Sequence, residues 1–328
     1  MKIGITSTIP VEIVYAAGHQ PCDLNNLFIC DTDPGRFIAR AEEAGFPRTT
    51  CAWIKGIYGV LQAEKIDTVI VVSGGDCSNT LALGEVLCND GLRVIPFSYP
   101  LRPDPKAMRR ALDRLARELN AEPEATATAK TRLDAVRRRL AELDRLTWEE
   151  GVVSGRENLN FLVSASDFKG DPESFAEEIA SLLAAARKRP VRPAARLRLG
   201  LAGVPPILGN LCETLEELGA ELVFNEVPRQ FAMPWAPECE LAEQYTRYTY
   251  PYQVERRLAD IAETCRVRKL DGIIHYTQSF CFRQIEDILF KRLLPVPVLT
   301  LEADRPETVD GRTLTRLETF IEMLSGAK

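Results

Sequence analysis

Short apolar segments alternate with longer segments of helical period along both halves of this 328-residue chain. This alternation is typical of β-α-β units, whose parallel strands form a central sheet. We expect strands at residues 2–6, 24–30, 68–73 and 93–97, and again at residues 197–202, 221–224, 272–276 and 297–301. We expect helices at residues 36–44, 52–64, 80–89, 208–218, 253–268 and 282–293. The sequence therefore predicts an α/β fold with two small doubly wound domains.

A charged helical segment separates the two halves. Residues 105–146 place leucines at helical spacing along one face, and the helix-breaking pair Glu122 and Pro123 predicts a hairpin of two helices. Another helix is expected at residues 172–187, followed by a basic, proline-rich linker at residues 188–193. We thus expect an N-terminal α/β domain at residues 1–104, a helical insert and linker at 105–190, and a C-terminal α/β domain at 191–328.

The two halves resemble each other in sequence. Residues 67–77 (DTVIVVSGGDC) align without a gap with residues 271–281 (DGIIHYTQSFC), so Cys77 matches Cys281. Seventeen residues beyond each cysteine lie Val94 and Val298, each within the next expected strand. Open α/β sheets bind ligands beyond the carboxyl ends of their strands. An internal duplication would therefore place one cysteine at such a position in each domain.

Composition excludes several classes of function. The chain has 41 basic and 47 acidic side chains, and the basic ones are interleaved with acidic ones, which argues against nucleic-acid binding. The N-terminal residues do not resemble a signal peptide, and no apolar run approaches the roughly 20 residues that span a membrane. We therefore expect a cytoplasmic protein without membrane partners. Its nine cysteines should be core residues, nucleophiles or metal ligands rather than disulfides.

Three cysteines are expected at the starts of helices. Cys77 and Cys281 follow matched strands, and Cys51 precedes an amphipathic helix with Thr49 or Thr50 nearby as a cap. Helix N-termini favour thiolate over thiol and offer N–H donors to anionic sulfur. Taken singly, each would be interpreted as a small buried hydrophobic residue. Together they predict one polynuclear metal centre, and three cysteines with few histidines suit iron–sulfur chemistry better than zinc.

Several local sequences resemble one known family. They are TCAWIKG at residues 50–56, GGDCSN at 74–79, GVVSGR at 151–156, the strand ending in Cys281, and PVLTLEAD at 297–304. These segments resemble the 2-hydroxyacyl-CoA dehydratase D-component family, which includes benzoyl-CoA reductase subunits and double-cubane cluster proteins. The resemblance implies two flavodoxin-like or Rossmann-like domains around a [4Fe-4S] cluster bound by Cys51, Cys77 and Cys281. It also implies an ATP-dependent iron–sulfur activator that delivers single low-potential electrons.

The same resemblance implies what the cluster does. Three thiolates leave one iron open, where the thioester carbonyl of an acyl-CoA binds and is reduced by one electron before the hydroxyl is eliminated. The chain begins directly at its first expected strand and shows no motif specific for the CoA pyrophosphate, so another small-molecule substrate stays open. A non-catalytic electron-relay or cluster-carrier subunit and a metal-free binding protein are further alternatives. Relatives pair two such subunits, as a homodimer or as a heterodimer with a related subunit.

The remaining cysteines bear on the size of the cluster. A double-cubane [8Fe-9S] cluster would need further thiolates, for which Cys30 and Cys239 are the candidates. We expect Cys22 at the amino end of the second strand, away from the cleft. Three others lie in expected amphipathic helices and should be core residues: Cys88, Cys212 and Cys265.

Other side chains are weaker candidates for a role in catalysis. Glu12 stands at the start of the first helix and could donate a proton if it faced the cleft. His275 lies in a strand near the cleft, where a hydrogen-bonded structural role is the alternative. The aromatic segment at residues 245–252 is expected to pack over the cleft or to form a subunit contact rather than to bind substrate.

Overall fold

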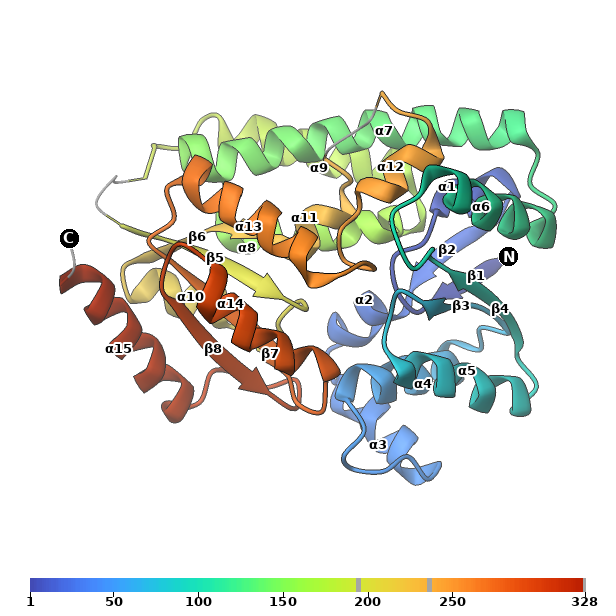
Figure 1. The fold of residues 1–328 in the computed structure, drawn as a ribbon, viewed down its shortest axis with the longest axis horizontal. Coiled ribbons are helices and arrows are strands. Elements are labelled where there is room, and N and C mark those ends of the chain that lie inside the picture. Colours follow the sequence, from blue (N-terminus) through green and yellow to red (C-terminus); the bar gives the residue numbers. More distant parts are fainter. Residues whose placement is uncertain (193–195, 235–237, 327–328) are drawn as a thin grey trace.

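The computed structural model describes residues 1–192, 196–234 and 238–326. Within these residues the strands form two four-stranded parallel sheets, one in each half of the chain, with the orders β2-β1-β3-β4 and β6-β5-β7-β8 (Figure 1). The strands of the first sheet are β1 (Lys2–Ile5), β2 (Gln20–Asp23), β3 (Thr68–Gly74) and β4 (Arg93–Ser98). Those of the second are β5 (Leu197–Gly203), β6 (Ala220–Asn225), β7 (Gly272–Gln278) and β8 (Val298–Ala303).

Helices cover both faces of the first sheet because its central strands are apolar on both sides. Ile70 and Val72 of β3 face one core, and Val69 and Val71 face another. The helices of this half are α1 (Val11–Ala16), α2 (Leu24–Ile29), α3 (Gly35–Glu43), α4 (Ala52–Glu64) and α5 (Ser78–Asn89). Strands buried on both faces are characteristic of parallel sheets.

A layer of helices connects the two halves. The helices are α6 (Pro105–Leu119), α7 (Pro123–Arg145), α8 (Gly155–Val163) and α9 (Pro172–Ala186), with the π-helical η1 (Leu146–Glu150) and the 3₁₀ turns η2 (Ser164–Ser166) and η3 (Phe168–Gly170). The chain breaks between α6 and α7 at Asn120, which has a left-handed backbone, so the predicted hairpin is confirmed. In Figure 1, α7 runs along the top of the molecule above both halves. Residues 188–192 are irregular, as expected for a linker, and Pro193 lies outside the described residues.

The second half repeats the layered arrangement. Its helices are α10 (Leu211–Glu217), α11 (Glu226–Phe231), α12 (Leu241–Arg247), α13 (Val254–Arg268), α14 (Asp287–Leu293) and α15 (Gly311–Gly326), with the 3₁₀ helix η4 (Phe282–Glu286). Leu258 and Phe290 pack on one face of the sheet, and Leu211 and Phe320 on the other. No helix in the part of the chain described here is long and apolar enough to cross a lipid bilayer.

The predicted duplication of α/β domains is confirmed by the identical strand order of the two sheets. In each sheet the order reverses between the first and the third strand, β1 and β3 or β5 and β7. Such a reversal opens a crevice at the carboxyl ends of the strands, where ligands bind. The duplicated fold therefore supplies two crevices, and the cysteines Cys77 and Cys281 follow the strands that border them.

The strand expected at residues 24–30 is wrong. This segment is helix α2, and the second strand is the preceding β2. Asp23 caps the helix, because its side chain accepts a hydrogen bond from the Asn25 N–H, and Leu24 and Phe28 then share one buried face. Pro21 weakens the strand signal of β2, but an edge strand tolerates proline.

The predicted positions of three cysteines are also wrong. Two depend on the shifted strand, and the third on the exposed face of α5. Cys22 lies within β2 and is buried, rather than preceding the strand, and Cys30 caps the C-terminus of α2 rather than ending a strand. Cys88 is exposed on α5, so its expected core position is wrong, because only one face of α5 packs on the sheet. Cys212 and Cys265 are buried core residues as expected.

Candidate functional site

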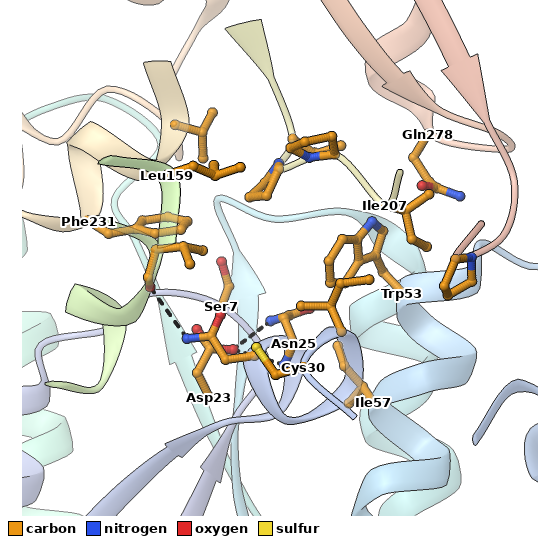
Figure 2. A pocket seen from close by; sticks show the side chains of 18 of the residues that line it. Ser7, Asp23, Asn25, Cys30, Trp53, Ile57, Leu159, Ile207, Phe231 and Gln278 are labelled. Carbon is orange, nitrogen blue, oxygen red and sulfur yellow. Dashed lines mark hydrogen bonds between the residues drawn. The ribbon is translucent and has the colours of Figure 1, made fainter. Parts of the chain in front are cut away.

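A cavity of about 980 Å³ is lined by residues of both halves and of the helical insert. Its walls include the segments that follow β1, β3, β5 and β7, at the two crevices of the sheets. Figure 2 shows Asp23, Asn25 and Cys30 on one side, Leu159 and Phe231 on another, and Trp53, Ile207 and Gln278 on a third. A concave, mostly apolar cavity with a few polar groups is the usual form of a small-molecule site.

The three cysteines predicted as ligands all line this cavity. Each cysteine has an extended backbone and stands immediately before a helix. Cys51 precedes α4, Cys77 precedes α5 and Cys281 precedes η4. The thiols are close enough to one another that the charges of Cys281 and Cys77 raise the pKa of Cys51, and the charge of Cys77 raises the pKa of Cys281. The fold thus brings together three side chains that are separated by up to 230 residues of sequence.

Backbone N–H groups point toward all three sulfur atoms. The thiol of Cys51 meets the backbone groups of Trp53 and Ile54, and that of Cys281 meets Arg283. The thiol of Cys77 meets backbone groups of the first turn of α5, and its sulfur lies 3.4 Å from Thr80 Oγ1. These donors favour negative charge on sulfur. Three sulfur atoms on one cavity, each with backbone N–H donors, are suited to act as thiolate ligands.

Burial works against ionisation of the same thiols. It raises the pKa of Cys51 to about 12, and it also raises the pKa values of Cys77 and Cys281, while the N–H donors oppose these shifts. A buried thiolate is therefore stable here only beside a cation. Buried thiols with preformed N–H donors fit a metal centre better than they fit a solvent-exposed nucleophile.

The chemistry of the donor atoms bears on the kind of metal centre that the cavity suits. Among the residues that the structure describes, no group of three or more His, Cys, Asp or Glu side chains is placed to hold a metal ion. A single ion requires its ligand atoms to converge on one point, at about 2.3 Å for zinc and sulfur. A cubane is held at its corners, so its thiolates stand apart by the width of the cluster. Three soft thiol donors that line one cavity are the ligand type of an iron–sulfur cluster.

The turn before Cys77 requires glycine. Gly75 has a left-handed backbone with φ of +92°, and a Cβ atom there would lie 2.7 Å from Cβ of Pro251 in the other half. At the matched turn, Phe280 before Cys281 has φ of +64°. A bulky residue in this conformation is strained, and strain of this kind concentrates at functional sites. Both turns that precede the cysteines thus contain a left-handed residue, which is unstrained at Gly75 and strained at Phe280.

The two candidate additional ligands are placed differently. Cys30 lines the cavity from the end of α2 (Figure 2). Cys239 lies before α12 and is not among the described residues that line the cavity. The structure thus brings Cys30, but not Cys239, to the cavity that contains the three cysteines.

Glu12 is placed in the protein interior. Its carboxylate forms an ion pair with Arg137 of α7 at 2.7 Å and accepts a hydrogen bond from the Tyr245 hydroxyl at 2.9 Å. The side chain is fully buried and does not line the cavity. The condition for its suggested role as a proton donor, that it face the cleft, is therefore not met.

His275 is held in β7 beside α14. Its Nδ1 lies 2.8 Å from Asp287 Oδ1, and its ring stacks on Phe290 at 4.0 Å. Burial lowers the pKa of His275, although Asp287 opposes this shift, so the ring is neutral at pH 7. Its packing matches the structural alternative, and it does not line the large cavity.

The aromatic segment at residues 245–252 packs the two halves of the chain together. Tyr245 and Tyr248 are buried, and the Tyr99 ring of the first half contacts Tyr248 at 5.8 Å. Tyr250 reaches the cavity wall and lies under Arg283, 4.4 Å from the guanidinium carbon to the ring centre. This segment therefore fixes one half against the other beside Cys281.

A buried ion network supports the helix that follows Cys281. Arg257 of α13 forms two hydrogen bonds of 2.8 Å with Glu226 and a third of 2.7 Å with Glu286 of η4. Glu286 also binds Arg283 at 2.9 Å. Burial raises the pKa of Glu226, but the Arg257 charge prevails and lowers it. The network therefore holds the Glu226 carboxylate ionised and anchors η4.

Sequence reasoning assigned no role to several polar residues of the cavity. Asp23 and Ser7 lie on its wall (Figure 2). Thr8 lies there with its hydroxyl beside that of Tyr248, and Trp53 Nε1 is buried there without a hydrogen-bond partner among the residues that the structure describes. The only local signal was their position, because Ser7 and Thr8 follow the first strand and Trp53 follows Cys51. Unpartnered buried donors are expected to find a partner in a bound ligand.

The chain was compared with known proteins. Its sequence matches the model of the family described as 2-hydroxyglutaryl-CoA dehydratase, D-component, over residues 6–324. No match was found among curated protein sequences. The family match spans nearly the whole chain and includes every strand except β1, the helical insert, and the cysteines Cys51, Cys77 and Cys281. The chain therefore belongs to the 2-hydroxyglutaryl-CoA dehydratase D-component family, as a subunit of the 2-hydroxyacyl-CoA dehydratase type.

Proposed function

We propose that this protein is a catalytic subunit that dehydrates 2-hydroxyacyl-CoA thioesters, with a [4Fe-4S] cluster bound by Cys51, Cys77 and Cys281. The observation that carries the proposal is the convergence of these three thiols, each with backbone N–H donors, on one cavity. The bound cluster would supply an open Lewis-acidic iron and single low-potential electrons. An ATP-dependent iron–sulfur activator, the partner type that the family implies, would reduce it.

The chain's own residues would bind and orient the substrate. Apolar side chains such as Leu159 and Phe231 on one side of the cavity and Ile57 on the other can hold an acyl chain and exclude water (Figure 2). The Thr8 hydroxyl and the Trp53 indole N–H, the latter without a partner in the described part of the chain, can donate hydrogen bonds to a ligand. Such donors would fix the orientation of a thioester that apolar contacts alone leave free to rotate.

A double-cubane [8Fe-9S] reductase is the second candidate, and one observation favours it. Cys30 lines the same cavity as the three proposed ligands and could supply a further thiolate. The two candidates differ in the iron bound per chain, which is about four for one cubane and about eight for a double cubane. The iron content of the Cys30→Ser variant provides a second comparison.

Substrate binding tests the catalytic role. Adding a 2-hydroxyacyl-CoA to anaerobically prepared, reduced protein is expected to change its electron paramagnetic resonance spectrum, because the substrate would meet the open iron. Free CoA, which lacks the acyl group, is the matched control and should leave the spectrum unchanged. With the activator and ATP, the same substrate is expected to yield the enoyl-CoA. An unchanged spectrum, with activity found only in complex with another subunit, would instead indicate an electron relay.

A further inference from the structure

Two buried aspartates lie side by side at the cavity wall. Asp23 ends β2, lines the cavity and is 3% exposed (Figure 2). Asp167, in the turn between η2 and η3, is 6% exposed and lies behind it. The two are in direct contact, because the Asp23 backbone N–H donates to Asp167 Oδ2 at 2.7 Å. This contact joins the first sheet to the helical insert.

The partners of this pair are unlike those of the other buried carboxylates. Glu12, Glu226 and Asp144 each bind an arginine. Within the described ranges, neither Asp23 nor Asp167 forms an ion pair, and their hydrogen bonds come from uncharged groups. The Asp23 carboxyl interacts with Asn25 and Ser166, and Asp167 accepts from the backbone N–H of Lys169.

Titratable groups on the surrounding elements do not neutralise the pair. The Tyr15 hydroxyl of α1 donates a hydrogen bond to the Asp167 carbonyl oxygen. Burial, and then the Asp167 charge, raises the pKa of Cys22 in β2. Burial raises the pKa of Cys30, at the end of α2, and the charges of both aspartates raise it further. The ammonium group of Lys169 binds Glu178 of α9 at 2.5 Å. The pair is therefore surrounded by neutral groups and by a lysine that already has its own carboxylate partner.

Two adjacent carboxyl groups in such surroundings do not both ionise. Burial raises the pKa of Asp167 to about 7, with the Asp23 charge as the next cause, and burial also raises the pKa of Asp23. The pair consequently retains a proton at neutral pH. Of the two residues, Asp23 is the one that lines the cavity.

We propose that Asp23 is the proton donor and acceptor of the cavity, and that Asp167 is a positioning residue that keeps the proton on the pair. This inference rests on the proposed function. Dehydration breaks the Cα–O bond and one Cβ–H bond and forms a C=C bond and water. Asp23 would give its proton to the departing hydroxyl, and the resulting carboxylate would take the Cβ proton, which restores the acid. The enoyl thioester and water together have the oxidation level of the substrate, so no net electrons are consumed.

The first test needs neither cluster nor substrate. Infrared titration of the isolated protein is expected to show a carboxylic-acid C=O band at pH 7 that disappears as the pH rises. The Asp23→Asn variant should lack this band and still fold, because asparagine also caps a helix. In Asp167→Asn the neighbouring charge is gone, so Asp23 should ionise at lower pH.

The control is Asp171→Asn, at an exposed helix cap, which should leave the band unchanged. A wild-type protein without the band at pH 7, or an Asp23→Asn variant that keeps it, overturns the inference.

Turnover separates this inference from the proposed function. With a 2-hydroxyacyl-CoA and the activator, Asp23→Asn is expected to lower kcat by about 10²- to 10⁴-fold, the range for losing a general acid or base, with iron content unchanged. In wild-type protein kcat should decline at alkaline pH as the acid loses its proton, and in Asp167→Asn this decline should begin at lower pH. Unchanged kcat in iron-loaded Asp23→Asn overturns the role of Asp23 and leaves the proposed function standing. Absence of dehydration by iron-loaded wild-type protein overturns the proposed function, while the infrared result still decides where the proton lies.

Discussion

The Cys51→Ser, Cys77→Ser and Cys281→Ser variants are each expected to lose most of their bound iron and at least about 100-fold in turnover. Losing an outer-shell partner of a metal site already costs about 10- to 100-fold, and here a ligand itself is removed. Serine keeps the side-chain size but replaces a soft thiolate with a poor iron ligand. Iron and sulfide analysis after anaerobic purification, with an absorption spectrum near 400 nm, measures the loss.

The other cysteines supply matched controls for these variants. Cys88→Ser changes an exposed cysteine on the outer face of α5 and should retain full iron content and activity. Cys239→Ser should do the same if one cubane is bound, because Cys239 does not line the cavity. Retention of iron in any one of the Cys51, Cys77 and Cys281 variants at the wild-type level would contradict the proposed ligand set.

The Arg257→Met variant is expected to lower the free energy of unfolding by about 3–5 kcal/mol, the typical cost of leaving a buried charge unpaired. Arg257 and Glu226 are both fully buried, and the arginine also binds Glu286. Urea denaturation at pH 7 measures the loss. Because Arg257 lowers the pKa of Glu226, the stabilisation is present above the unfolded-state pKa of glutamate and is lost as the pH falls. The difference between variant and wild type should therefore shrink in acid.

Two further variants separate the buried charge from the loss of packing. The double variant Glu226→Gln with Arg257→Met removes both charges and should recover part of the lost stability. Arg266→Met breaks an exposed pair with Glu263 and should change stability by less than about 0.5 kcal/mol. If the double variant is as unstable as the two single losses added together, the unpaired charge is not the cause.

Hydrophobic periodicity and the internal repeat were sufficient to predict the architecture. The gapless alignment of Cys77 with Cys281 placed both at strand ends, and the identical strand order of the two sheets agrees with it. The β2–α2 region could not be predicted from its pattern alone. Residues 24–29 are apolar enough for a strand, and the Asp23 cap that makes them a helix is a single local hydrogen bond.

The polar groups of the site were harder to predict because their partners are distant in sequence. Glu12 stands at a helix start, which made it a candidate acid of the cavity, but Arg137 and Tyr245 hold it in the interior. Asp23 carried no signal of its own, since its environment depends on Asp167, which is 144 residues away. Burial without a neutralising cation is a property of tertiary packing, and a sequence pattern does not record it.

The central claim is that three cysteines of this chain hold one [4Fe-4S] cluster. The most direct measurement is iron and acid-labile sulfide per chain in the wild-type protein purified without oxygen. About four irons and four sulfides per chain are expected, in a brown protein that bleaches when any of the three cysteines is replaced. Colourless protein without iron would contradict the claim, and about eight irons per chain would replace the single cubane with a double one.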